Sequence, residues 1–527
     1  MIRVASSKHT TSVAAGSKAA SLASYVFVGR IVTFLMTGIA LILVTRLLGS
    51  SQYGVYTIAV AFAGIFGSIG SSGIGTAMNK FISEYRARKQ PDEVSRVVSN
   101  SLLMLIVSGV ILTALCYVLS SIIANYVYPT SMYGGSMGQT IQLISFYITT
   151  SILYGALYDA LLGFGNGKHV AIAAFVQSFF QSVVSIALAF QMHTAAAPIE
   201  GLVVGSLLGF FAGVYMIFKY NNIRLVMPSF KYMKKLWGFS VPVGSTVILG
   251  NLMGSIALIY LGYFVAPSVI GNVGIVGRVS ALISVIFDSI SFALLPTFSA
   301  ALVSKGVKDK VGRLYGYAVY LAILMVGPIL FYMGIFAQQF TVFLFGSSYL
   351  LAPTFISILC LGLLIGIAGS YANTLLIGAS KTGFVLKNNI IASLVYLVLT
   401  LIFAPKFGAL AYILAASLIY PIVMDYLFIS KLMKMFKIDL RIGKLSRLVI
   451  ADAVVSCAVF LLTGSLSGIL LLICAGIGFL ILYPLVSVLV GGADKADIST
   501  IKALTKEIPA VGLVMRLVVD YAGVALR

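Results

Sequence analysis

Long apolar stretches separated by short polar breaks run along most of this chain. The first stretch, YVFVGRIVTFLMTGIALILVTRLL, starts at Tyr25, and a break at Gly49–Tyr53 leads into a second, glycine-rich stretch. That stretch ends in the charged segment NKFISEYRARKQPDEVSR. A hydrocarbon core about 30 Å thick needs roughly 20 apolar residues per helix. The pattern therefore predicts two membrane-spanning helices, joined by a tight outer break and closed by a basic inner loop.

The same alternation continues to about residue 490 and predicts an all-α polytopic membrane protein with fourteen spans. The predicted spans are residues 24–48, 54–78, 97–123, 139–163, 169–191, 200–218, 238–264, 271–300, 316–337, 353–378, 389–404, 409–430, 448–465 and 468–490. Composition agrees, because 60% of the residues are hydrophobic and 9% are charged, whereas a soluble domain has about 25% charged residues.

The basic residues divide unevenly between the two sides of these spans. Of the 35 Lys and Arg residues, 31 fall in the two tails or in every second loop, and only Lys406 lies in an opposite loop. Lys and Arg accumulate on the cytoplasmic side of membrane proteins. The sequence thus predicts a plasma-membrane protein with both termini in the cytoplasm. The net charge of +21 is accounted for by this asymmetry and does not indicate nucleic-acid binding.

The two ends of the chain carry no recognisable site. Residues 1–23 are rich in Ser, Ala and Thr and are expected to form an irregular cytoplasmic tail, with no cleavable signal peptide. Residues 491–527 are expected to form a cytoplasmic C-terminal tail. The cysteines stand alone in apolar runs, so we expect small core residues rather than metal ligands: Cys116, Cys360, Cys457 and Cys474.

A shift of 217 residues reveals a weak internal repeat. It aligns Gly54 with Gly271 and places Asp92, Val94 and Arg96 on a second D-x-V-x-R segment that starts at Asp309. Because the shift moves the second span onto the eighth, the two copies keep one orientation in the membrane. We therefore predict an N-lobe at 24–235 with spans 1–6 and a C-lobe at 236–430 with spans 7–12. The pair of extra helices would occupy 431–490, and a pseudo-twofold axis along the membrane normal would relate the lobes.

Several segments resemble one family of membrane proteins. They are RLLGSSQYGVY from Arg46, GNVGIVGRVSALISVIFDSISFALLPTFS from Gly271, LFGSSYLLAP from Leu344, and LLIGASKTGFVLKNN with the later APKFGALAYILA. On these segments the chain resembles the polysaccharide-biosynthesis or O-antigen flippase branch of the multidrug, oligosaccharidyl-lipid and polysaccharide exporter superfamily. The similarity extends over residues 24–430, although each segment alone is loosely defined.

The resemblance implies a transporter and not an enzyme. It implies that a lipid-linked oligosaccharide, on a polyprenyl or dolichyl phosphate type of carrier, is flipped from the cytoplasmic to the outer leaflet. Transport would proceed by alternating access through a cavity between two six-helix lobes. The expected partners are this substrate, the bilayer and polysaccharide-assembly proteins, with no nucleic acid. We expect a monomer without a cofactor, in which H⁺ or Na⁺ is the coupling ion if one is used.

Three arginines lie within predicted spans and are the hypothetical cavity residues that contact substrate: Arg30, Arg46 and Arg278. Arginine suits phosphate because its guanidinium group bonds two oxygens at once. The alternatives are snorkelling to the inner surface for Arg30 and a structural ion pair for Arg278. Arg46 lies two residues before the outer loop, where an anchoring role at the rim is the stronger interpretation.

Four acids also fall within predicted spans: Asp159, Asp288, Asp425 and Asp452. Asp159 and Asp288 are the candidates for proton or Na⁺ coupling, and structural ion pairs are the alternative. A drug or organic-cation antiporter of the same superfamily is the competing function. It would be expected to have acids rather than arginines in the cavity, because its substrates are positive.

Overall fold

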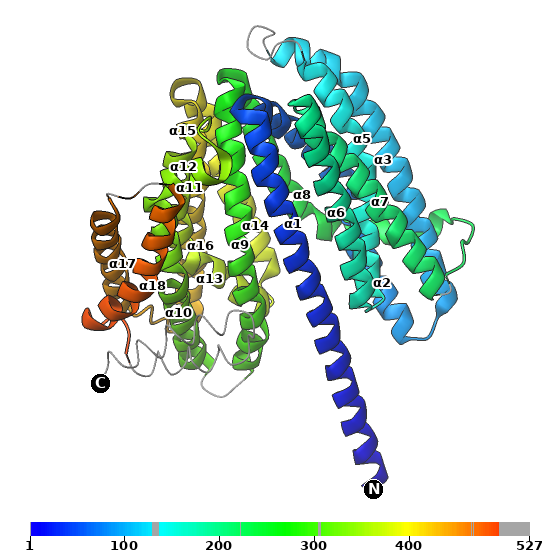
Figure 1. Ribbon diagram of the computed structural model, residues 1–527. Helices are drawn as coiled ribbons and strands as arrows, with labels where there is room; N and C mark the ends of the chain where they lie inside the picture. Colours follow the sequence, from blue (N-terminus) through cyan, green and yellow to red (C-terminus); the bar gives the residue numbers. More distant parts are fainter. Residues whose placement is uncertain are drawn as a thin grey trace. The chain divides into compact units, whose positions relative to one another are not determined.

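The computed structural model describes a chain built of α-helices (Figure 1). The described residues are 2–128, 136–221, 223–303, 307–464, 466 and 468–494, and they contain no β-strand. The chain divides into two compact units, Met1–Gly271 and Asn272–Arg527. Each unit is considered by itself below.

The first unit consists of seven described helices and the beginning of an eighth. These are α1 (Ile2–Ser71), α2 (Ile74–Ala87), α3 (Pro91–Val127), α5 (Met137–Gly163), α6 (Gly167–Met192), α7 (Ala196–Asn221) and α8 (Phe230–Phe264), followed by the first residues of α9 (Pro267–Leu302). Helix α6 packs along α7 and α1, and α8 packs against α1, α2 and α3. The core of the unit is aliphatic and aromatic, with Tyr53, Ile58 and Met78 among its fully buried side chains.

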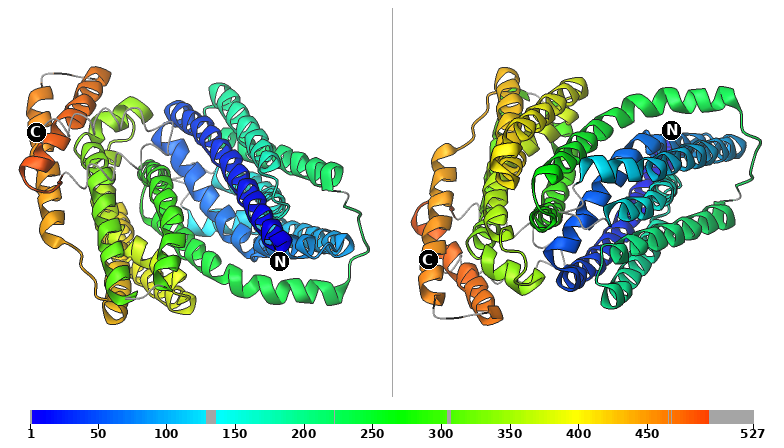
Figure 2. Two further views of the ribbon diagram at one scale, coloured as in Figure 1. Left: turned by 90° about the horizontal axis from the view of Figure 1, so that it is seen from below. Right: turned by 90° about the horizontal axis from the view of Figure 1, so that it is seen from above.

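The second unit contains the rest of α9 and shorter, more interrupted helices. They are α10 (Val307–Ile335), α11 (Ala337–Phe345), α12 (Ala352–Ile365), α13 (Ile367–Gly378), α14 (Thr382–Phe407), α15 (Ala409–Leu414), the π-helical turn η1 (Ala415–Ile419), α16 (Tyr420–Met435), α17 (Ile442–Thr463) and α18 (Gly468–Leu489). Helices α17 and α18 lie side by side, as Figure 2 shows in orange. Helix α17 also packs against α10.

Eleven helices in the described part are long and apolar enough to cross a membrane, or twelve if the bent pair Ala352–Ile365 and Ile367–Gly378 counts as one span. The chain is therefore a multi-pass membrane protein, while the predicted number of fourteen is not confirmed. Two places account for the difference. Gly29–Ala87 counts as one helix of 59 residues where two spans were predicted, and the apolar stretch Ile248–Phe264, found among the described residues of α8, is too short to be counted as a span.

The predicted break after the first apolar stretch is present in the backbone. Gly49 leaves the helical conformation with φ 68° and ψ 174°, so α1 is two helical segments joined at this residue. A positive φ is readily adopted by glycine, which has no Cβ to clash with its own carbonyl group. The helix also begins earlier than expected: it starts at Ile2, so the prediction of an irregular tail at 1–23 was wrong.

Two of the segments that carried the family resemblance have a visible structural role. Asn272, from the GNVG segment, accepts hydrogen bonds at Oδ1 from the backbone N–H groups of Leu351 and Ala352, at 3.0 and 2.7 Å. These donors stand at the start of α12, where backbone N–H groups have no partner within the helix. The Asn272 side chain thus caps the helix that follows the LFGSSYLLAP segment.

The segments aligned by the internal repeat begin their helices in the same way. Asp92 lies in the first turn of α3 and Asp309 in the first turn of α10. An acidic side chain there is stabilised by the positive end of the helix dipole. The predicted lobe boundaries and the pseudo-twofold axis stay predictions.

Candidate functional site

The three predicted arginines are all exposed in the structure of the protein alone. Arg30 and Arg46 both belong to α1, sixteen residues apart, which corresponds to about 24 Å along the helix and about 160° around it. They therefore point in nearly opposite directions and do not form one binding site. Arg278 lies in the second unit, eleven residues after the start of α9, or about 17 Å along the helix.

The position of Arg30 is fixed by the contact between α1 and α6. A Cβ atom on the neighbouring Gly29 would lie 2.9 Å from Cβ of Ala171, so the two helices touch at this level. Farther along, the Ser182 hydroxyl donates to the Met36 carbonyl at 3.3 Å. Gly29 is buried in this contact while Arg30 is exposed beside it. The arginine side chain thus extends from the edge of a rigid helix pair.

Asp159, predicted as a coupling residue, lies on the contact between α5 and α2. A Cβ atom on Gly75 would lie 2.4 Å from Oδ2 of Asp159, so the carboxylate packs directly on the α2 backbone. Two side chains hold the helices together nearby. The Ser83 hydroxyl donates to the Gly163 carbonyl at 3.0 Å, and Nη1 of Arg86 donates to the Phe164 carbonyl. Asp288, the other predicted coupling residue, belongs to α9, but its side chain lies outside the described part.

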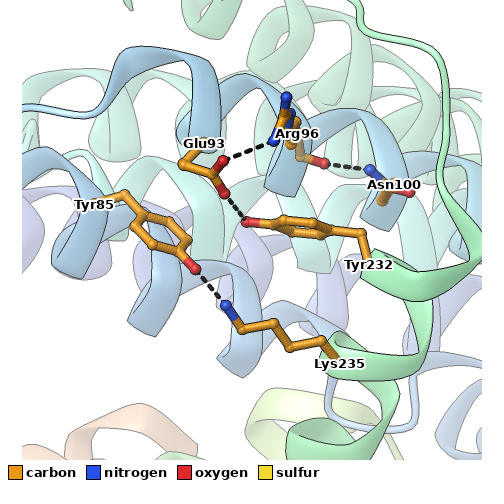
Figure 3. A network of polar contacts seen from close by, with 6 residues as sticks. All are labelled: Tyr85, Glu93, Arg96, Asn100, Tyr232 and Lys235. Atoms are coloured by element: carbon orange, nitrogen blue, oxygen red, sulfur yellow. Dashed lines mark hydrogen bonds and ion pairs between the residues drawn. The ribbon is translucent and has the colours of Figure 1, made fainter.

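The end of α2 and the beginnings of α3 and α8 are joined by the polar network of Figure 3. Glu93 on α3 accepts hydrogen bonds from Nη1 of Arg96 and from the Tyr232 hydroxyl, each at 2.9 Å. Lys235, one turn after Tyr232 on α8, donates to the Tyr85 hydroxyl at 2.6 Å. Burial raises the pKa of Tyr232, and hydrogen bonds with Tyr85 and Glu93 raise it further. The Tyr232 proton is therefore retained at physiological pH and remains available to Glu93.

The segment that leads from α7 into α8 is held along one face of α3. The backbone N–H of Arg224 donates to Ser95 Oγ at 3.3 Å, and that of Val226 to Ser99 Oγ at 3.0 Å. The N–H of Ser229 donates to Asn100 Oδ1 at 2.8 Å. Ser95 and Ser99 share one side of the helix because they are four residues apart, and Asn100 is the next residue along α3. This ladder fixes the point at which α8 begins.

Two lysines at the same end lie over aromatic rings. Nζ of Lys80 is 4.0 Å from the centre of the Phe239 ring and 4.9 Å from that of Phe81. Nζ of Lys235 is 5.4 Å from the centre of the Phe81 ring. A cation over a ring face is attracted by the ring quadrupole, so both charges are held at the α2–α8 contact. An arrangement of this kind can attract a phosphorylated group toward this end of the first unit.

The second unit holds three of the four acids found in predicted spans, and the side chains of two of them, Asp425 and Asp452, are described. Asp425 on α16 packs on Gly369 of α13, where a Cβ atom would lie 2.0 Å from Oδ1. Asp452 on α17 is completely buried. Within the described residues, no three His, Cys, Asp or Glu side chains gather as a metal site would require. Cys116 and Cys360 are buried as predicted, whereas Cys457 is exposed on α17.

Sequence reasoning missed the polar network and the aromatic contacts of Lys80 and Lys235. The basic segment at 231–235 was visible in the sequence as an inner loop. Its pairing with Tyr85 and Glu93 was not, because these residues lie more than 130 positions away. The position of Glu93 in the first turn of α3 was the one available signal.

The chain matches the polysaccharide biosynthesis protein family over residues 21–302, which is more than half of its length. A search of curated proteins found no match. Among solved structures, the fold is similar to "Lipid II flippase MurJ, inward closed conformation", with a TM-score of 0.69 and 15% identity, covering 88% of this chain and 97% of the other.

Two further similarities concern transporters described as members of the MOP superfamily. One is the inward-facing conformation of a multidrug resistance MATE family transporter, with a TM-score of 0.62, 16% identity, and coverage of 76% of this chain and 96% of the other. The other is a transporter from Pyrococcus furiosus whose description reports a binding pocket of reverse polarity. Its TM-score is 0.56 at 16% identity, with coverage of 81% and 96%. At such identities these structures establish a shared fold.

Proposed function

The chain belongs to the polysaccharide biosynthesis protein family, and on that premise we propose that it is a membrane transporter that flips a lipid-linked oligosaccharide. The carrier is a polyprenyl or dolichyl phosphate type of lipid. Transport runs from the cytoplasmic to the outer leaflet and supplies cell-surface glycan assembly. The shared fold with a protein described as a lipid II flippase supports this choice of substrate class.

One observation carries the proposal: two arginines that belong to long apolar helices keep exposed surface in the protein alone. Arg30 and Arg278 are both exposed in the protein alone. A charged side chain at the centre of a membrane helix costs about 2.5–3.5 kcal/mol on insertion scales. That cost is offset if the guanidinium faces an aqueous cavity or an anionic ligand. A phosphate or diphosphate headgroup is the anion that such a transporter would bring to this depth.

Two lysines of the first unit fit the first step of the proposed transport, in which the substrate arrives from the cytoplasm. With both termini in the cytoplasm, Lys80 and Lys235 lie on the side from which the substrate enters. Both side chains are exposed, so they can attract the phosphorylated headgroup before it reaches Arg30. Asp159 then serves as a coupling residue for H⁺ or Na⁺, and Asp288 is the second candidate for that role.

The cell in which this chain works provides the first test. Removing the protein should leave lipid-linked oligosaccharide accumulated and facing the cytoplasm, with loss of the surface glycan, and restoring the wild-type chain should reverse both effects. Sensitivity to cationic drugs, with glycan export unchanged, would favour the competing function of an organic-cation antiporter. If removal of the protein changes neither glycan export nor drug sensitivity, both functions are contradicted.

A further inference from the structure

Asp452 occupies an unusual position for an acid in a membrane helix. It is the eleventh of the 22 residues of α17, and none of its surface is exposed. It faces the contact that α17 makes with α10 and α18. The residues beside it on α17, Leu448, Ala451 and Val455, are also fully buried and are aliphatic. The carboxyl group therefore lies inside an apolar part of the second unit.

No hydrogen bond reaches this carboxyl group within the described part of the chain. Oδ1 and Oδ2 of Asp452 are both buried without a partner, and so are Oγ of Ser456 and the hydroxyl of Tyr483. Ser456 follows Asp452 by one helical turn and shares its side of α17. Tyr483, on α18, is close enough to Asp452 to interact with it electrostatically. Four oxygen atoms from α17 and α18 that have no hydrogen-bond partner are thus enclosed at this contact.

Among the described residues, the helices packed around Asp452 place no positive charge beside it. From α10, the Tyr320 hydroxyl donates to the Gly492 carbonyl at 2.8 Å, and the Tyr332 hydroxyl to the Leu472 carbonyl at 2.5 Å. The charged residues of α10 lie near its start, the last being Arg313, fourteen residues or about 21 Å of helix before Gly327. Helix α18 has no charged residue. On α17 itself, Lys444 pairs with Asp494, and Arg447 donates to the Gly491 carbonyl at 3.4 Å.

The space around the carboxyl group excludes a coordinated metal ion. Gly327 of α10 packs on it so closely that a Cβ atom there would lie 2.7 Å from Oδ2. A hard metal cation such as Mg²⁺ or Ca²⁺ needs about six or more oxygen ligands, and Gly327 offers no side chain as a ligand. A proton needs no such ligand shell. An ionised carboxylate without a partner would cost several kcal/mol in this interior, whereas the neutral acid can donate to a neighbouring hydroxyl oxygen.

We propose that Asp452 is a proton-binding site, occupied while α10, α17 and α18 are packed as in this structure. When these helices separate enough to admit water, the carboxyl group passes its proton to water and becomes a carboxylate. Repacking requires that the carboxylate take a proton from water again. This cycle would couple one proton to the movement of the helix pair α17–α18. The coupling rests on the proposed transport function. Ser456 and Tyr483 are positioning residues, because their hydroxyl oxygens lie beside the acid without a partner and either can accept its one O–H.

Infrared spectroscopy of the purified full-length protein tests proton binding without any transport assay. The wild-type spectrum at neutral pH should contain a carbonyl band of a protonated carboxyl group that is absent from Asp452→Asn. Asp159→Asn, which changes a partly exposed intramembrane acid, should retain the band. If Asp452→Asn does not fold, Asp452→Leu provides the same comparison with an apolar residue of similar size. Identical carboxyl bands in wild type and variant would show that Asp452 is ionised and would overturn the proposal.

Transport in proteoliposomes tests the coupling. Flipping of lipid-linked oligosaccharide by wild-type protein should depend on an imposed pH gradient, and Asp452→Asn should lose that dependence while Asp309→Asn keeps it. An unchanged dependence in Asp452→Asn would contradict the coupling role. If wild-type protein flips no such lipid, the proposed function and the coupling fail together, and the infrared band still decides whether Asp452 binds a proton.

Discussion

Gly54 and Gly271, the two glycines that the internal repeat aligns, lie against each other in the first unit. A Cβ atom on Gly54 would be 2.9 Å from the backbone nitrogen of Gly271, and one on Gly271 would be 3.2 Å from that of Gly54. The same hypothetical atoms would meet the carbonyl oxygens of Pro267 at 1.7 Å and of Ser50 at 2.0 Å. The start of α9 and the second segment of α1 thus touch backbone to backbone. Small residues permit such close approach of membrane helices.

Gly54→Ala should therefore separate these two helices. The added methyl group meets backbone atoms, which cannot rotate away, so the cost should be at least the 1–3 kcal/mol that is typical of overpacking. Gly277→Ala is the matched control, since nothing lies within 4 Å of a Cβ atom at that position of α9. Thermal unfolding of both variants in detergent provides the comparison. Equal midpoints would show that the backbone contact is absent from the protein in solution.

Glu93→Ala should loosen the start of α8. The substitution removes the acceptor of two hydrogen bonds, from Arg96 and Tyr232, at a cost of about 1–3 kcal/mol in total. Trp237 is the single tryptophan of the chain and follows this turn, so its fluorescence should report the change. Quenching of Trp237 by a water-soluble quencher should increase in Glu93→Ala and stay at the wild-type level in Lys234→Ala. The same quenching in wild type and Glu93→Ala would exclude a role of the network in fixing α8.

Glycan export should depend on the shape of the Arg30 side chain as well as on its charge. Because guanidinium binds two phosphate oxygens and ammonium acts as a point charge, Arg30→Lys should retain part of the glycan export that Arg30→Ala loses. Arg46→Ala should reduce export less than Arg30→Ala, since the sequence predicts Arg46 at the outer rim. Arg88→Ala is the surface control, because Arg88 pairs with Glu84 in an exposed ion pair. The amount of surface glycan, measured in cells at equal protein levels, ranks the export activity of these variants. Full export by Arg30→Ala would show that Arg30 does not contact the substrate.

Most of the fold could be predicted from the alternation of apolar and polar segments, because each membrane helix must satisfy its backbone hydrogen bonds internally. The break at Gly49 and the helix starts near Asp92 and Asp309 were visible for local reasons. The alternation of apolar and polar segments did not determine the number of spans. The two segments of α1 follow each other directly at Gly49, and the apolar stretch Ile248–Phe264 of α8 is short, so hydropathy alone does not say how many spans these helices make.

Within the candidate site, the sequence predicted only those residues whose type is unusual for their position. Arg30 and Arg278 stood out because a charge in an apolar helix is costly wherever it points. The contact of Lys235 with Tyr85 depends on how distant helices pack, and so does the burial of Asp452 behind Gly327. Asp452 had been noted as one of four intramembrane acids, but its lack of any hydrogen-bond partner in the described part has no sequence signal.

The rate at which purified, reconstituted Arg278→Ala flips a lipid-linked oligosaccharide tests the central claim most directly. Loss of a charge-assisted contact worth about 1.5–3 kcal/mol should slow flipping about ten- to a hundredfold. Arg313→Ala, which removes an exposed arginine near the start of α10, should flip at the wild-type rate. Flipping by Arg278→Ala at the wild-type rate would contradict the claim that intramembrane arginines receive the phosphorylated headgroup.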